Sequence, residues 1–158
     1  MDSRLSTCRL RNLNYQNNED MKLKLYIIDQ LAGILQSGVS ISKMEDRKAK
    51  RDLMDDYIAL RKLCKEALAD REEIIRKFQT DWGGELAEVE ALRKSGKAEG
   101  HEAYLKAEKD AQEAITDLFA REVEVNIIPV KKEAVADFFV GNLEQWAVLL
   151  ENGIIIDA

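Results

Sequence analysis

The chain has 158 residues, of which 46% are hydrophobic and 34% charged, and its formal net charge is −6 at pH 7. A chain of this length buries roughly 70% of its unfolded surface, enough for one core. This composition excludes an intrinsically disordered chain, and the negative charge disfavours nonspecific binding to nucleic acid or anionic lipid. No segment approaches 18 uninterrupted apolar residues, so we expect no membrane-spanning helix.

Residues 1–20 are rich in Asn, Ser and Arg and show neither a helical nor a strand period. We expect a disordered leader here, followed by a single domain over residues 21–158. The leader lacks the apolar run of a secretory signal. The two cysteines, Cys8 and Cys64, suggest no disulfide framework. Together these features predict a cytoplasmic protein.

The first expected strand lies at "MKLKLYIID", residues 21–29, where apolar and polar residues alternate at the start. Alternation would send Leu23, Leu25 and Ile27 to one face of a strand. Asp29 is then placed to cap a short helix, which Gly38 would end in the left-handed conformation.

A long helix is expected next. Residues 42–45, "SKME", have the spacing of a capping box, which predicts a helix start there. Apolar residues then recur at alternating steps of three and four, as in a coiled coil. This seam comprises Leu53, Tyr57, Leu60, Cys64, Ala67, Ile74 and Phe78.

A second periodic stretch supplies the partner for this helix. Tyr104, Ala111, Ile115 and Leu118 follow the same rhythm, which predicts an antiparallel helical hairpin. The glycine-rich residues 81–100 would form its tip. A short helix of their own is expected around Leu86, Val89 and Leu92.

The C-terminal third predicts two more strands separated by short helices. Residues 123–128 alternate as in a strand, and Pro129 ends the pattern because it lacks a backbone N–H. One helix is expected over 131–141, and Asn142 with Gln145 predicts the capped start of another. Residues 154–156, three isoleucines, would form a third strand paired with the first two.

The fold class predicted is therefore α+β and mostly helical, with a long antiparallel helical hairpin on a small three-stranded sheet and short C-terminal helices. Burying each terminal isoleucine would contribute about 1.5–3 kcal/mol, which favours the sheet. The alternative is that the isoleucines form an exposed hook for another chain.

No catalytic, cofactor or metal signature is found. His101 is the one histidine and follows Gly100 in the expected hairpin tip, so we interpret it as a solvated residue at a helix start. Too few histidines and cysteines converge for a zinc site, and no phosphate-binding glycine motif occurs. Asp55 and Asp56 are adjacent, so on a helix their side chains would diverge rather than share a magnesium or acid/base site.

Charge is distributed unevenly. Residues 43–65 contain eight basic and five acidic residues, whereas residues 66–124 contain sixteen acidic and nine basic ones. A basic end could contact nucleic acid, but no aromatic residues interleave with the cations as base stacking needs. The acidic arm could instead occupy a basic groove on a partner, as an inhibitor that imitates nucleic acid would.

The order of elements around "IIDQLAGIL", "VEVNIIPV" and "LLENGIIID" resembles a family of small uncharacterised proteins of tailed phages and prophages. The resemblance spans residues 21–157 and rests on pattern, length and strand–helix junctions. It implies a phage or mobile-element origin, residence in the host cell cytoplasm and a non-enzymatic accessory role. No functional residues can be carried over.

Three functional hypotheses follow. The first is a non-enzymatic protein that acts in assembly or host takeover by binding a protein partner or a second copy of itself, without a cofactor. The expected interaction residues are Leu63, Leu68, Ile75, Trp82 and Trp146. The alternatives are an acidic inhibitor of a host nucleic-acid-binding defence enzyme, and an enzyme whose site combines Tyr, Asp and Glu side chains.

Overall fold

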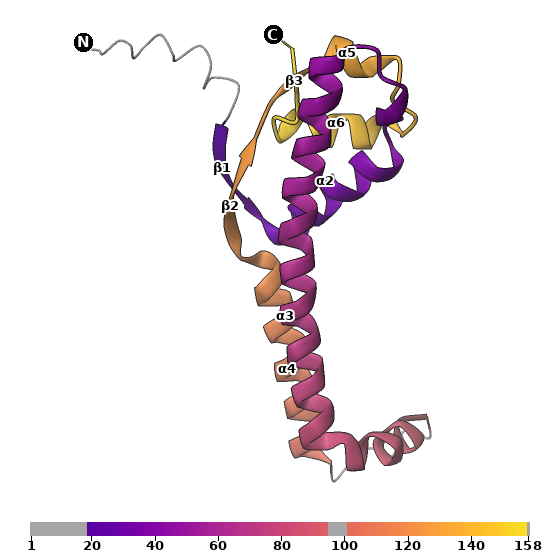
Figure 1. Cartoon of the computed structure of the whole chain (residues 1–158). Coiled ribbons are helices and arrows are strands. Elements are labelled where there is room, and N and C mark those ends of the chain that lie inside the picture. The colour runs from indigo at the N-terminus through magenta and orange to yellow at the C-terminus, as the bar shows by residue number, and fades with distance from the viewer. Residues whose placement is uncertain (1–18, 95–100, 158) are drawn as a thin grey trace, which may run out of the picture. The chain divides into compact units, whose positions relative to one another are not determined.

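The computed structural model describes residues 19–94 and 101–157 (Figure 1). Its contacts divide the chain into two compact units. Unit 1 comprises the chain up to Cys64 together with the segment from Glu122 onward, and unit 2 comprises Lys65–Arg121. The elements in chain order are β1 (Glu19–Lys24), α2 (Leu25–Ser37), the 3-10 turn η1 (Ile41–Lys43), α3 (Arg47–Lys94), α4 (Glu102–Ala120), β2 (Glu122–Ile127), β3 (Val130–Lys131), α5 (Lys132–Ala136), α6 (Leu143–Glu151) and β4 (Ile155–Ile156).

The predicted class, a mostly helical α+β protein, is confirmed. The expectation of one domain over residues 21–158 stays a prediction. Glu19 and Asp20, assigned above to the leader, belong to β1, while residues 1–18 lie outside the described residues.

Unit 1 contains an antiparallel pair of strands, β1 and β2. Met21 lies opposite Val125 and Leu23 opposite Val123, so apolar residues of the two strands share one face. Val125 and Ile127 are buried. The strand predicted at residues 123–128 is therefore confirmed to within one residue at each end.

The first expected strand is shorter than predicted. β1 ends at Lys24 and α2 begins at Leu25, so Leu25 and Ile27 belong to a helix. The physical reason is that apolar residues recur at helical spacing from Leu25 onward and are buried: Leu25, Ile28, Leu31, Ala32, Ile34 and Leu35. Asp29 lies inside α2 and does not cap it, and Gly38 ends it in a right-handed rather than a left-handed conformation.

The start of the long helix also differs from the prediction. Residues 41–43 form the turn η1, and α3 begins at Arg47. Asp46 supplies the cap, because its Oδ1 accepts a hydrogen bond from the Ala49 N–H at 3.0 Å. The capping box predicted at residues 42–45 is wrong.

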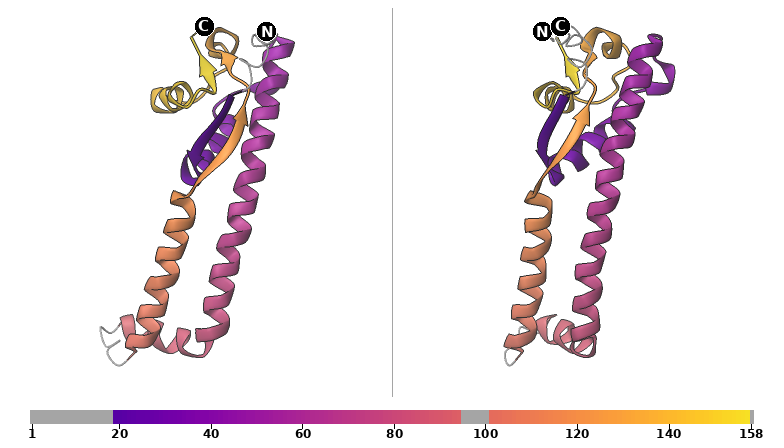
Figure 2. Two further views of the ribbon diagram at one scale, coloured as in Figure 1. Left: turned by 90° about the vertical axis from the view of Figure 1, so that its left-hand side faces the viewer. Right: turned by 60° about the vertical axis from the view of Figure 1, so that its left-hand side comes forward.

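Unit 2 is the predicted antiparallel hairpin, formed by the later part of α3 and by α4, which lie side by side (Figure 2). Asp70 and Arg121 pair at one end, with 3.8 Å between the charged atoms. Near the other end Tyr104 packs against Trp82, with ring centroids 6.0 Å apart. Residues 86–92 continue α3 and do not form a separate helix.

The first half of the predicted seam lies in unit 1. Leu53 and Leu60 are fully buried there and contribute to the same core as α2. The first part of the seam therefore packs in unit 1 and the second part in unit 2. Because α3 contributes to both units, it is more than twice as long as α4.

The predicted three-stranded sheet is wrong. β4 pairs with β3 in parallel as a second two-stranded sheet, separate from β1 and β2. Pro129 separates β2 from β3 because it has no N–H to continue the ladder. Ile154 and Ile155 are fully buried, which excludes the alternative of an exposed isoleucine hook.

The C-terminal helices follow the prediction in part. α5 is shorter than expected, and Phe139, in the segment after it, forms an isolated bridge with Val39. The capping box at α6 is confirmed: Asn142 Oδ1 accepts from the Gln145 N–H at 2.9 Å, and Gln145 Oε1 accepts from the Asn142 N–H at 3.1 Å.

Candidate functional site

The residues predicted to bind a partner are distributed over both units. Leu63 of unit 1 and Ile75 of unit 2 are half-buried, and Leu68 of unit 2 is exposed. Trp82 packs edge-on against Tyr104 inside the hairpin, so its main contact is internal. Trp146 of α6 is half-buried and packs against Phe139 with ring centroids 4.9 Å apart. Of these residues, Trp146 lies at the surface pocket described next.

A surface pocket of about 500 Å³ lies at the start of α6. We call it the α6 pocket. Its lining residues are Ala136, Phe139, Gly141, Asn142, Leu143 and Trp146. Leu143 is 86% exposed, and nearby Val140 is 65% exposed. Because Leu143 is the first residue of α6, the capping box fixes the backbone that carries it.

The residues that flank the α6 pocket in sequence are acidic. Glu133, Asp137 and Glu144 are exposed and flank the lining residues in sequence. Residues 133–157 contain five acidic residues and no lysine or arginine. Lys132, just before this stretch, forms an ion pair with Asp157. Three carboxylates therefore flank the α6 pocket in sequence, while Lys43 lines a neighbouring pocket together with Val140.

A second exposed apolar surface lies on the first four turns of α3. Five exposed residues recur there at steps of four, three, four and three: Arg47, Arg51, Met54, Ile58 and Arg61. This spacing places them on one face of the helix, which we call the α3 face. Met54 is 46% exposed and Ile58 60%. Asp52 and Asp56 lie off that face at helical spacing, whereas the exposed Asp55, four residues after Arg51, lies at its edge.

Beside the α3 face lies a pocket of about 430 Å³, which we call the α3 pocket. Its lining residues are Ile41, Ser42, Lys50, Met54, Tyr57 and Ile58. Lys50 is held at the edge, where its Nζ donates to the Ser42 carbonyl at 3.0 Å. The lining is almost wholly apolar while the charged residues around it are basic.

Sequence reasoning missed the α3 face and Leu143. The signal was present, because residues 47, 51, 54, 58 and 61 form a second heptad stripe alongside the predicted seam. Leu143 gave no such signal. It appears as one apolar residue among several in α6, and only its exposure distinguishes it.

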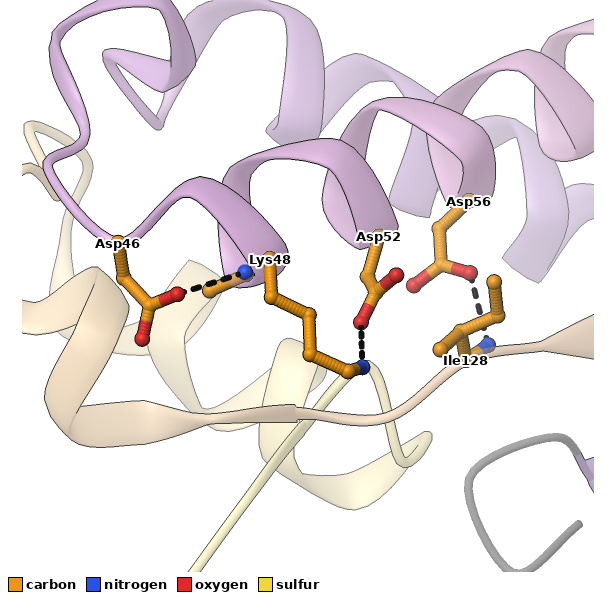
Figure 3. A network of polar contacts seen from close by, with 6 residues as sticks. Asp46, Lys48, Asp52, Asp56 and Ile128 are labelled. Carbon is orange, nitrogen blue, oxygen red and sulfur yellow. Dashed lines mark hydrogen bonds and ion pairs between the residues drawn. The ribbon is translucent and has the colours of Figure 1, made fainter. Parts of the chain in front are cut away.

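Among the residues that the structure describes, Asp56 is the one charged residue that is buried (Figure 3). Its Oδ1 accepts a hydrogen bond from the Ile128 N–H at 2.8 Å. The pKa of Asp56 is raised to about 7, mainly because burial disfavours the charged form. The negative charges of Asp52 and Asp55 also raise this pKa, and the hydrogen bond from Ile128 lowers it. Asp55 is exposed, so the two adjacent aspartates diverge as predicted.

A pocket of about 420 Å³ lies near this network, and its lining includes Asp46, Lys48, Asp52 and Lys131 but not Asp56. Lys48 and Asp52 form an ion pair with each other. The carboxyl whose pKa is raised, Asp56, therefore holds the backbone of Ile128. In the pocket, Asp46 is exposed, and Asp52 is half-buried and paired with Lys48.

Other chemical groups have internal partners. His101 precedes α4, as predicted, but it is half-buried rather than solvated, and its Nδ1 lies 3.1 Å from Glu85 Oε2. Burial and the neighbouring Asp29 carboxylate raise the pKa of the Cys64 thiol to about 11, which keeps it protonated and unreactive.

Within residues 19–94 and 101–157 no three His, Cys, Asp or Glu side chains cluster as metal ligands would. No helix in those ranges is long and apolar enough to cross a membrane.

Comparisons of the chain with protein-family models, with curated proteins and with solved structures found no match. The functional argument therefore depends on the surfaces of the chain itself.

Proposed function

We propose that this protein acts by binding another protein chain through the exposed apolar surfaces of unit 1. The observation that carries the proposal is the exposure of Leu143, at 86%, at a helix start held by a capping box beside the α6 pocket. Burying one leucine stabilises a contact by about 1.5–3 kcal/mol. A leucine fixed next to an aromatic pocket is a typical anchor for a protein interface.

The enzyme alternative has less support. The carboxyl with a strongly raised pKa, Asp56, is 1% exposed and does not line the neighbouring pocket. A catalytic acid or base must come within hydrogen-bond distance of its substrate. The bond to Ile128 favours a structural role for this group.

The phage origin and the inhibitor alternative remain predictions. Both concern which protein is bound, and neither changes the surface that we propose as the contact. Neighbouring genes for capsid and tail proteins would favour an assembly role, and a cluster of defence-evasion genes would favour inhibition.

Photocrosslinking tests the proposed surface. A photoreactive amino acid at Val140 is expected to form a discrete protein adduct in cells that express the full chain. The same group at the exposed Gln79 of unit 2 serves as the control. A second substitution, Leu143→Asp, should remove the adduct at Val140. Equal adducts at both positions, or an adduct at Val140 that Leu143→Asp does not affect, would contradict the proposal.

A further inference from the structure

The partner can be specified further if the proposed function is correct. We infer that the chain binds a second copy of itself, with the acidic α6 surface of one copy against the basic α3 face of the other. Leu143 of the first copy enters the α3 pocket of the second. The inference rests on the proposed function for the α6 surface and adds the identity of its partner.

The apolar parts of the two surfaces are complementary. Leu143 is a projecting side chain, and the α3 pocket of about 430 Å³ has room for such a group among Met54, Tyr57 and Ile58. On the other side, Met54 and Ile58 are exposed and can cover the α6 pocket around Trp146. Both apolar surfaces would leave water in a single contact.

The charges of the two surfaces are opposite. Arg47, Arg51 and Arg61 are exposed on the α3 face, and the exposed Asp55, four residues after Arg51, lies at its edge, so the arginines outnumber the carboxylate there. The α6 surface carries Glu133, Asp137 and Glu144 within a stretch that has no basic residue. Each surface repels a copy of itself and attracts the other, which sets the pairing and its orientation.

The contact is therefore between unlike surfaces. Every copy carries both surfaces in unit 1, so one copy can donate Leu143 while offering its own α3 face to another. If two copies make this contact twice about a two-fold axis, they form a dimer. If each pair makes it once, the copies form closed rings or open chains, depending on whether the rotation between them closes. A contact in which Leu143 meets Leu143 would place like charges opposite each other.

A mixing experiment tests this pairing directly. Leu143→Asp disables the α6 surface and keeps the α3 face, whereas Ile58→Glu disables the α3 face and keeps the α6 surface. Both residues are exposed, so both variants should fold as the parent chain does, which circular dichroism would verify. Sedimentation velocity from 5 to 500 μM would measure association of the full chain, of each variant and of their equimolar mixture.

The full chain is expected to associate as concentration rises, and each variant alone should remain monomeric where the full chain associates. The mixture should form one-to-one heterodimers, since one intact pair of surfaces remains. Association of the full chain should weaken at least tenfold between 50 and 500 mM NaCl because ions screen the opposed charges. Gln79→Asp, at an exposed position of unit 2, is the control and should associate as the parent chain does.

A full chain that stays monomeric throughout would overturn the inference, and so would a mixture of variants that stays monomeric. These outcomes differ from failure of the proposed function. A monomeric chain that still forms a Leu143-dependent adduct with a different protein at Val140 would retain the α6 surface as a binding site and would reject the second copy as its partner.

Discussion

Asp56 of α3 accepts a hydrogen bond from the backbone N–H of Ile128, 72 residues further along the chain, at 2.8 Å. Ile128 lies between β2 and β3 and precedes Pro129, where the strand ladder is interrupted. The carboxylate therefore satisfies a backbone donor that neither sheet engages. Oδ2 of Asp56 is buried and has no hydrogen-bond partner among the described residues, so ionisation of this carboxyl is costly.

The free energy of unfolding should consequently decrease as pH rises from about 4 to about 7. The pKa of Asp56 is about 7 in the folded chain and the ordinary aspartate pKa is 3.8, so in that window the unfolded chain releases a proton that the folded chain retains. Below pH 4 both states hold the proton and the contribution is fully present, and above pH 7 it is lost. The shift corresponds to at most about 4 kcal/mol, at ~1.4 kcal/mol per pKa unit.

Asp56→Asn keeps an oxygen acceptor for Ile128 and removes the charge. Urea denaturation at pH 5, 6, 7 and 8 should show that the variant is more stable than the parent chain by an amount that grows from pH 5 to pH 7 and then levels off. Asp55→Asn, at the exposed neighbour, is the control and should leave most of the pH dependence in place. A parent chain whose stability does not change between pH 5 and 8 would refute the raised pKa.

Two glycines should respond oppositely to alanine. Gly33 lies in α2 and a Cβ there meets nothing within 4 Å, so Gly33→Ala should stabilise the fold by about 0.5–1 kcal/mol. At Gly141 a Cβ would overlap Gln145 Oε1 and come within 2.8 Å of Phe139 Cζ. Gly141→Ala should displace the Gln145 side chain from the capping box, and we expect a loss of about 1–3 kcal/mol.

Thermal unfolding of the two variants measures this difference. Adding Gln145→Ala to Gly141→Ala should reduce the additional cost of the alanine, because one of the two obstructing groups is then absent. An unchanged cost in the double variant would assign the strain to Phe139 alone.

The buried end of the chain should be essential for stability. Ile154 is fully buried and its carbonyl accepts the Val130 N–H at 3.0 Å. Ile154→Ala should cost about 2–5 kcal/mol, as large-to-small core substitutions do. Val140→Ala is the exposed control, expected within about 0.5 kcal/mol of the parent chain. Guanidinium denaturation compares the two, and equal midpoints would mean that the terminal isoleucines contribute little.

Local patterns gave correct predictions where a structure is stabilised by residues close in sequence. Alternation marked β2, the heptad rhythm marked the α3–α4 hairpin, and the spacing of Asn142 and Gln145 marked the start of α6. Prediction failed where two local signals competed. At Leu25 a short alternation and a longer helical period overlapped, and the helical period prevailed because it buries more apolar residues in the core.

The sequence by itself determined the mostly helical α+β class, the antiparallel hairpin and the capped last helix, since their periods and caps lie within a few residues of one another. Only the tertiary structure decided that the terminal isoleucines pair with β3 in a separate sheet, that Asp56 holds Ile128, and that Leu143 remains exposed. These features join residues tens of positions apart or depend on what covers a side chain. These contacts are determined by the packing of the whole unit, and the local spacing of residues does not predict them.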